Sequence, residues 1–189
     1  TTAMETIAPL AGPGGWFQLY PPAAPGMEAD MIARARAAGY PGIMVTVDIP
    51  GATRRRRDMR SGLVVPPRIG PRMLAEIAVR PAWALGMAGR GIPDFENFSR
   101  YYPRGGGLDA AAEFLGRMMT GHITPDRLAR IRAAWPGKLI VKGVLSVADA
   151  DLALSLGADG IVVSNHGGRQ LDAAPTAPQV LPGIRARLG

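Results

Sequence analysis

The stretch "KLIVKGVLSVADADLALSLGADGIVVSN" (residues 138–165) contains two apolar runs separated by a segment of mixed polarity. The runs at 138–143 and 160–165 are short, rich in valine and isoleucine, and bounded by glycine, which is typical of strands covered on both faces. The segment at 146–157 opens on a serine and closes on a glycine, a pattern that predicts a helix. Strand, helix and strand at this spacing predict a βαβ unit with parallel strands and a right-handed crossover.

The same alternation occurs earlier in the chain. "WFQLY" (16–20) and "GIMVTVD" (42–48) predict two further strands, because both are apolar runs that follow glycine- and proline-containing turns. Helices are predicted over 28–38, which stops before Gly39, and over 124–134, which a threonine and a proline open. The pattern indicates an α/β protein, either a (β/α)₈ barrel or a doubly wound sheet.

Residues 51–107 interrupt this rhythm. A connection of this length between a strand and the next helix is typical of a functional or mobile insertion. Its segment "PRMLAEIAVRPAWALGMAGRG" (71–91) mixes large apolar residues with arginines. Two interpretations are open: a short helix packed on the domain, or a surface that contacts a membrane or a partner.

The composition limits the classes of protein to which this chain can belong. The 189 residues suffice for one domain with a core, and 47% hydrophobic with 20% charged residues is ordinary for a globular protein. We expect neither a spanning helix nor a signal peptide, because no apolar run approaches 18 residues and the first ten residues lack a basic, then apolar pattern. With no cysteine in the chain, disulfides are excluded and a cytoplasmic location is expected.

The net charge of +7 favours anionic partners. The excess is arginine, since Lys138 and Lys142 are the only lysines, and a GC-rich genome accounts for much of it. We predict no nucleic-acid partner, because the chain has no zinc-finger spacing and no RNA-binding aromatic pattern. No metal site is predicted either, because two histidines without cysteine offer few ligands.

Polar side chains stand at the end of each predicted strand. Carboxyl ends of parallel strands meet on one side of a sheet, which is where α/β folds bind ligands. We therefore expect one cluster that includes Gln18, Tyr20, Thr46, Asp48, Lys142, Ser164 and His166.

Each charged member of this cluster has two interpretations. Lys142 either forms a structural ion pair with a nearby acid or presents a fixed positive charge to an anionic ligand. His166 is either an ordinary loop histidine or a general base that Asp48 orients. Arg55 and Arg169 suit bidentate capture of a carboxylate, although arginines 54–57 could instead form a solvated basic face. His122, the second histidine, is predicted to be structural or on the surface.

Four motifs resemble the FMN-dependent 2-hydroxy-acid dehydrogenases and oxidases, a group that includes glycolate oxidase, lactate oxidase and mandelate dehydrogenase. The motifs are "WFQLY" (16–20), "TVDIP" (46–50), "LIVKG" (139–143) and "SNHGGRQLD" (164–172). The resemblance implies a (β/α)₈ TIM barrel, of which residues 1–189 form one partial domain with the third to sixth β/α units. Residues 51–107 then form the active-site loop insertion.

The resemblance also implies roles for individual residues. The flavin contacts are Gln18, Thr46, Lys142 and Ser164; the substrate contacts are Tyr20, Arg55, His166 and Arg169; and the catalytic pair is His166 as base with Asp48 as its acidic partner. The implied reaction oxidises an L-2-hydroxy acid to the 2-oxo acid and passes electrons to a quinone, a cytochrome or oxygen. Thr53 and Arg56 depart from the glycine and acid usual in the family around the first substrate arginine.

The resemblance further implies a tetramer for the full-length protein. It also implies membrane-surface contact through 62–104, on the inner face of the plasma membrane. Two family strands on each side fall outside the 189 residues, together with the phosphate-binding loops. We therefore expect the 189 residues alone to bind FMN poorly. The alternative function is a non-catalytic half-barrel that serves only as a folding or binding module.

Overall fold

The computed structural model describes residues 2–49, 60, 70–91, 95–101, 113–114, 116, 118 and 122–189. The chain divides into two compact units: residues 1–3 with 54–115, and residues 4–53 with 116–189. Most of the predicted 51–107 insertion belongs to the first unit, and each unit is considered by itself below. Arg55, Thr53 and Arg56 lie outside the described residues.

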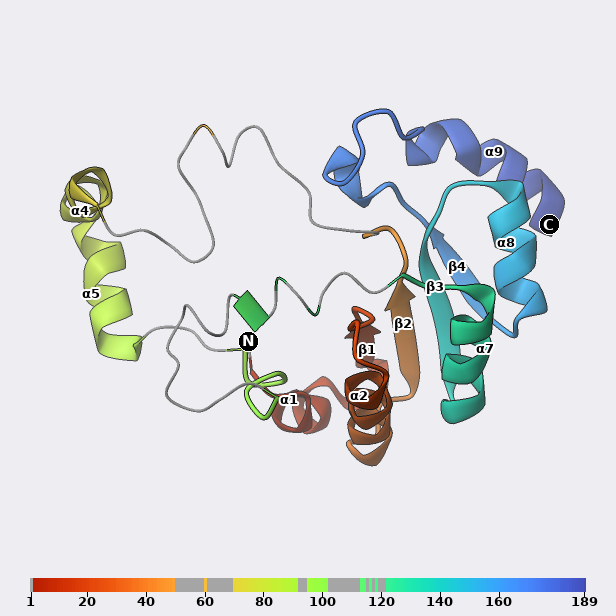
Figure 1. Ribbon diagram of the computed structural model, residues 1–189, viewed down its shortest axis with the longest axis horizontal. Coiled ribbons are helices and arrows are strands. Elements are labelled where there is room, and N and C mark those ends of the chain that lie inside the picture. Colours follow the sequence, from red (N-terminus) through yellow and green to blue (C-terminus); the bar gives the residue numbers. More distant parts are fainter. Residues whose placement is uncertain are drawn as a thin grey trace. The chain divides into compact units, whose positions relative to one another are not determined.

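The larger unit contains a four-stranded parallel sheet with the order β1-β2-β3-β4 (Figure 1). The strands are β1 (Trp16–Leu19), β2 (Gly42–Thr46), β3 (Lys138–Val144) and β4 (Gly160–Val163). All four predicted strands are confirmed, and neighbours in sequence are neighbours in the sheet. Three strands end earlier than predicted, so Tyr20, Asp48 and Ser164 lie in the loops just beyond the sheet.

Helices alternate with these strands. They are α1 (Met4–Ala11), the 3₁₀ turn η1 (Gly12–Gly14), α2 (Pro25–Ala37), α7 (Pro125–Ala134), α8 (Val147–Ser155), the 3₁₀ turn η2 (His166–Gly168) and α9 (Ala177–Leu188). The helices predicted over 28–38, 124–134 and 146–157 correspond to α2, α7 and α8. Proline at its first position lets α2 begin three residues earlier than predicted.

Side-chain caps fix where α7 and α8 begin. The Thr124 hydroxyl accepts a hydrogen bond from the Arg127 amide at 3.3 Å, and the Ser146 hydroxyl accepts one from the Asp149 amide at 3.0 Å. Each cap satisfies an amide that the first turn of a helix leaves without a partner. The loop between β3 and α8 is therefore short and defined.

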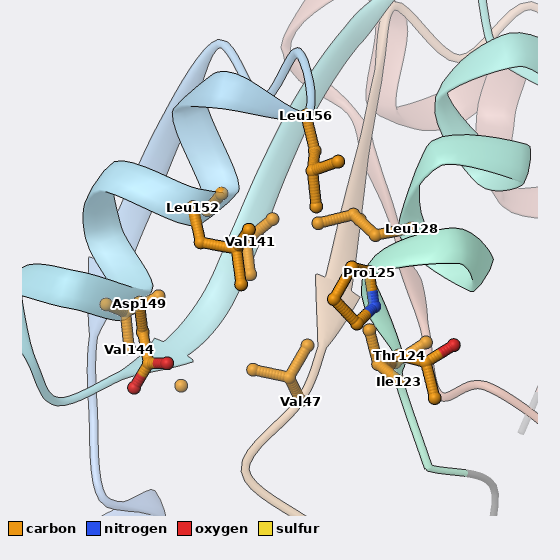
Figure 2. Close-up of a pocket in the computed structure, with 12 residues that line it drawn as sticks. Val47, Ile123, Thr124, Pro125, Leu128, Val141, Val144, Asp149, Leu152 and Leu156 are labelled. Atoms are coloured by element: carbon orange, nitrogen blue, oxygen red, sulfur yellow. The ribbon is translucent and has the colours of Figure 1, made fainter.

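Alternation along the strands separates a packed face of the sheet from an open one. On the packed face lie the buried side chains Phe17, Leu19, Ile43, Val45, Leu139 and Val141. Val141 contacts the helix layer, where it lines a cavity of about 270 Å³ with Leu128 of α7 and Leu152 of α8 (Figure 2). On the opposite face, the paired residues Gln18, Met44 and Ile140 are all partly or fully exposed within the described structure. The site below therefore lies beside an incompletely covered sheet.

The loop after β1 is held by a buried ion pair between α2 and α7. Arg127 Nε donates to Glu28 Oε2 at 2.8 Å, and a second guanidinium nitrogen of Arg127 donates to the Pro22 carbonyl. The side chains of Arg127 and Glu28 are 12% and 9% exposed. This contact fixes the chain two residues beyond Tyr20, at the same end of the sheet as the site.

The smaller unit includes two helices, α4 (Pro71–Ala78) and α5 (Pro81–Arg90). Of the two interpretations left open for this segment, the first expected one short helix, whereas the structure has two. The break falls where Pro81 lacks the amide proton that would continue α4, while its ring suits the first position of α5. No residue of either helix is buried. Among the described residues, no helix is long and apolar enough to cross a membrane.

Candidate active site

The strand ends bring four polar side chains together. Thr46 at the end of β2 pairs with Lys142 of β3, and Lys142 pairs with Val162 of β4. The chain then leaves β2 toward Asp48 and leaves β4 toward Ser164, so both side chains reach Lys142 from its two sides. The cluster of Asp48, Lys142, Ser164 and His166 joins three neighbouring strand ends, as the sequence pattern predicted.

Asp48 is the centre of this cluster. Its Oδ1 lies 2.9 Å from His166 Nδ1, while its Oδ2 accepts hydrogen bonds from Lys142 Nζ at 2.9 Å and from Ser164 Oγ at 3.0 Å. The Asp48 side chain is 5% exposed. The arrangement satisfies both carboxylate oxygens, which a buried charge requires. Lys142 thus forms a structural ion pair with Asp48, as the first of its two interpretations predicted.

The charge state of Asp48 follows from its neighbours. Burial acts to raise the pKa of Asp48, but hydrogen bonds from Lys142, His166 and Ser164 outweigh burial and hold the pKa below its usual range. A carboxyl whose pKa is lowered by folding stabilises the folded state above its unfolded pKa. That stabilisation is lost as the pH falls through the lowered, folded value. Asp48 is therefore ionised throughout the neutral range.

The backbone at His166 is unusual. It has a φ of 57°, and it is the one non-glycine residue with positive φ in the part of the chain that the structure describes. Gly167 and Gly168 follow with φ of 67° and 68°, values that glycine adopts without steric cost. The Asn165 side chain closes the turn by accepting from the Gly168 amide at 3.1 Å. The two glycines let the chain reverse directly after His166.

In this turn the two imidazole nitrogens of His166 have distinct roles. Because Nδ1 faces the Asp48 carboxylate at 2.9 Å, it carries the proton in the neutral ring. The Nε2 nitrogen then carries the lone pair, and no described residue is hydrogen-bonded to it. With its side chain 17% exposed, His166 has the orientation that a general base needs.

Gly143 permits Asp48 to approach β3. It has a φ of 116° and sits where the β3–β4 register shifts between Lys142 and Val144, as in a β-bulge. A Cβ atom at position 143 would lie 2.6 Å from Asp48 Cβ and 2.7 Å from the Asp48 amide nitrogen. Only glycine fits here, so the bulge makes room for the central carboxylate. No sequence pattern indicated this role, which depends on a contact between residues 95 positions apart.

We expect Gly143→Ala to lower the free energy of unfolding by about 1–3 kcal/mol, because it combines a strained φ with a steric overlap. Chemical denaturation of the variant and the wild type measures the difference. Gly26→Ala is the matched control, because a Cβ there meets no atom within 4 Å and its φ is ordinary. Equal stability of Gly143→Ala and the control would contradict the steric role.

The other predicted site residues lie nearby with fewer contacts. Gln18 Nε2 donates to Thr46 Oγ1 at 2.9 Å, so the structure brings these two together. Tyr20 is partly buried just beyond β1, and Arg169 is exposed three residues after His166. The Arg169 amide donates to the His166 carbonyl at 3.3 Å, but among the described residues no side-chain hydrogen bond or ion pair joins Tyr20 or Arg169 to the cluster. Gln170, which sequence reasoning did not single out, has a buried Oε1 without a hydrogen-bond partner among the described residues.

The groups at these strand ends fit the edge of a flavin ring, which carries both carbonyl oxygens and an N–H. Lys142 has three ammonium protons, and two of them have acceptors in Asp48 and Ser164. The third is free for a further acceptor, and the Lys142 side chain is 20% exposed. The Gln18 amide supplies both a donor and an acceptor on the open face of the sheet. These residues would hold the ring of FMN.

Comparison with known proteins shows which family the chain resembles. The FMN-dependent dehydrogenase family matches residues 1–189. An L-lactate dehydrogenase of Pseudomonas syringae is 39% identical over 188 residues, 99% of this chain and 49% of the relative. An L-lactate dehydrogenase of Caulobacter vibrioides is 40% identical over 175 residues, 92% of this chain and 45% of the relative.

Solved structures show the same relationship. A monotopic membrane (S)-mandelate dehydrogenase matches with a TM-score of 0.90 and 32% identity, over 98% of this chain and 49% of that protein. A mandelate oxidase matches with a TM-score of 0.68 and 31% identity, over 99% and 44%. The chain spans about half the length of these relatives, consistent with four β/α units of a (β/α)₈ barrel. It belongs to the family of FMN-dependent dehydrogenases.

Proposed function

We propose that the protein oxidises an L-2-hydroxy acid to the 2-oxo acid with FMN. The observation that carries the proposal is the hydrogen bond between His166 Nδ1 and Asp48 Oδ1 at 2.9 Å, which leaves Nε2 as a base at the carboxyl ends of the strands. FMN, when bound, supplies the acceptor for the two electrons. Lactate- and mandelate-like acids are the substrate classes that the related proteins suggest.

His166 is assigned the proton transfer. It removes one proton from the substrate: from the hydroxyl if Cα loses a hydride, or from Cα if a carbanion forms. In both cases the ring becomes a cation, and the ionised Asp48 stabilises that cation at 2.9 Å. The cluster thus supplies both the base, His166, and the negative charge of Asp48 that stabilises the protonated base.

Substrate binding is assigned to residues around the base. The exposed guanidinium of Arg169 follows His166 by three residues and, with Arg55, would hold the substrate carboxylate by paired hydrogen bonds. Tyr20 would contact the same substrate from the end of β1. Gln18, Thr46 and Lys142 would face the flavin. We propose that electrons leave the reduced protein to a quinone, a cytochrome or oxygen.

A panel of 2-hydroxy acids tests the proposal. The full-length gene product, loaded with FMN, is mixed anaerobically with L-lactate, L-mandelate and glycolate, and loss of flavin absorbance is recorded. Bleaching by at least one L-acid, but not by its D-enantiomer, is the expected result. Bound FMN that none of these acids bleaches would favour the non-catalytic half-barrel.

We also propose that α4 and α5 contact a membrane surface. Leu74, Val79, Trp83 and Leu85 are 57%, 74%, 54% and 74% exposed, an unusual density of large apolar side chains on two short helices and the turn between them. Arg72, Arg80 and Arg90 accompany one acid, Glu76. Apolar side chains with flanking arginines suit an anionic lipid surface. The related (S)-mandelate dehydrogenase is itself a monotopic membrane protein.

The double variant Trp83→Ser/Leu85→Ser is expected to weaken binding to anionic vesicles at least about tenfold, because each side chain loses apolar area that the lipid would cover. Vesicle sedimentation with phosphatidylglycerol–phosphatidylcholine mixtures measures the partition coefficient. Leu152→Ser, a change of a less exposed leucine in α8 (43%), is the control and should bind like the wild type. Unchanged binding of the double variant would overturn the membrane assignment.

A further inference from the structure

The hydroxyl of Ser164 has every hydrogen-bonding position in use. Its single proton is donated to Asp48 Oδ2 at 3.0 Å. Its lone pairs accept from the His166 amide at 3.0 Å and from Lys142 Nζ at 3.3 Å. A serine hydroxyl offers one donor and two acceptor positions, so the protein itself saturates this group. In this arrangement it has no proton left to donate to a flavin.

One of these bonds holds the backbone of His166. The left-handed conformation at a φ of 57° is strained for a non-glycine residue and persists only where other contacts compensate. The bond from the His166 amide to the side chain two residues earlier is such a contact. It fixes the peptide from which the imidazole extends.

The second bond holds the carboxylate that orients the ring. Ser164 and Lys142 both bind Oδ2 of Asp48, which turns Oδ1 toward His166 Nδ1. The Ser164 hydroxyl is therefore bonded both to the backbone amide of His166 and to Asp48, the acid that holds the His166 ring. Loss of the hydroxyl would release both restraints together, whereas loss of Lys142 would release only one.

We propose that Ser164 is a positioning residue that aligns the His166–Asp48 pair. The inference rests on the proposed function for its kinetic consequence, but the geometric alignment stands independently of it. Ser164 acts through its neighbours, because its bonds to the His166 amide and to Asp48 set the direction of Nε2.

The test compares Ser164→Ala, Ser164→Thr and the wild type in the full-length, FMN-loaded protein. Stopped-flow reduction by a saturating 2-hydroxy acid is expected to slow about 10- to 100-fold in Ser164→Ala, a typical cost of a misplaced catalytic group. Substrate affinity and FMN content should stay within about twofold, and Ser164→Thr should recover most of the rate.

Amide hydrogen exchange supplies a readout that does not need turnover. The His166 amide should exchange faster in Ser164→Ala than in the wild type or in Ser164→Thr. Ser155→Ala is the control, because that hydroxyl bonds only the Leu152 carbonyl within α8. If Ser164→Ala does not fold, Ser164→Cys, which keeps the size but bonds weakly, carries the same expectations.

The outcomes separate the two proposals. Ser164→Ala with a wild-type rate and unchanged exchange at His166 would overturn the positioning role. So would loss of FMN with a normal rate for each bound flavin, because that result indicates a cofactor contact. A wild type that no 2-hydroxy acid reduces would defeat the proposed reaction, while exchange at the His166 amide would still decide whether Ser164 positions it.

Discussion

Replacing His166 with glutamine is expected to slow flavin reduction by a 2-hydroxy acid about 10²- to 10⁴-fold, the usual contribution of a general base. Glutamine keeps a polar side chain of similar reach but has no nitrogen that accepts a proton at neutral pH. FMN should stay bound, because the residues assigned to the ring are Gln18, Thr46 and Lys142. The expected result is a loss of chemistry without a loss of cofactor.

Anaerobic stopped-flow spectroscopy of the FMN-loaded, full-length protein measures this rate, and the ratio of flavin to protein absorbance measures occupancy. His122→Gln is the matched control: this histidine is exposed, and among the described residues only its backbone carbonyl is engaged, by Arg127. Its rate should equal that of the wild type. Normal bleaching in His166→Gln would refute the assignment of the base.

Asp48→Asn is expected to have a comparable kinetic effect for a different reason. The carboxylate accepts from three donors, whereas an asparagine amide would direct its NH₂ at one of them. His166 would then lose the partner that fixes its tautomer and stabilises its cation. We expect flavin reduction to slow by about 10²- to 10⁴-fold, the scale on which an acid that orients a catalytic histidine acts.

The same variant should be less stable. Lys142 is only 20% exposed and would be left without its counter-charge. We expect the free energy of unfolding at neutral pH to fall by about 1–3 kcal/mol. The wild type should lose the contribution of Asp48 as the pH falls through the lowered pKa of this group, whereas the variant has no such contribution to lose. The two stabilities should therefore converge in acid.

Urea denaturation between neutral and acidic pH measures the stability difference. Asp126→Asn serves as the control, because Asp126 is an exposed acid in the first turn of α7. It should cost no more than a few tenths of a kcal/mol. A stability gap between Asp48→Asn and the wild type that persists unchanged into acid would contradict the ionised state of Asp48.

The sheet could be predicted from local pattern because each strand is a short apolar run between turn residues. The helices α7 and α8 could be predicted in the same way, because Thr124 and Ser146 are typical N-cap residues that come just before their first turns. Two helices, α1 and α9, were not predicted from the sequence. The start of α9 carried a usable signal, because Thr176 and Gln179 form a capping box, whereas α1 contains Pro9 and lacks a comparable opening pattern.

For the site, only the set of residues that lie close together could be predicted, and not their individual contacts. Parallel strands place Asp48, Lys142 and His166 at one edge, and this much follows from topology. The hydrogen-bond partners of Asp48 depend on strand register and on side-chain direction. So does the need for a bulge in β3 at Gly143. No local sequence pattern encodes either property. Ser164 illustrates the limit: the motif that contains it does not show that its hydroxyl bonds Asp48, Lys142 and the His166 amide at once.

In the proposed reaction, the sharing of Asp48 between Lys142 and His166 would have a consequence for product release. With a neutral imidazole the three groups sum to no net charge, so a substrate carboxylate meets a balanced site. Once His166 has taken a proton, the same groups carry one positive charge beside an anionic 2-oxo acid. Linkage then requires that loss of the proton and departure of the product favour each other. The release of product would become faster at a pH where His166 readily returns its proton to water.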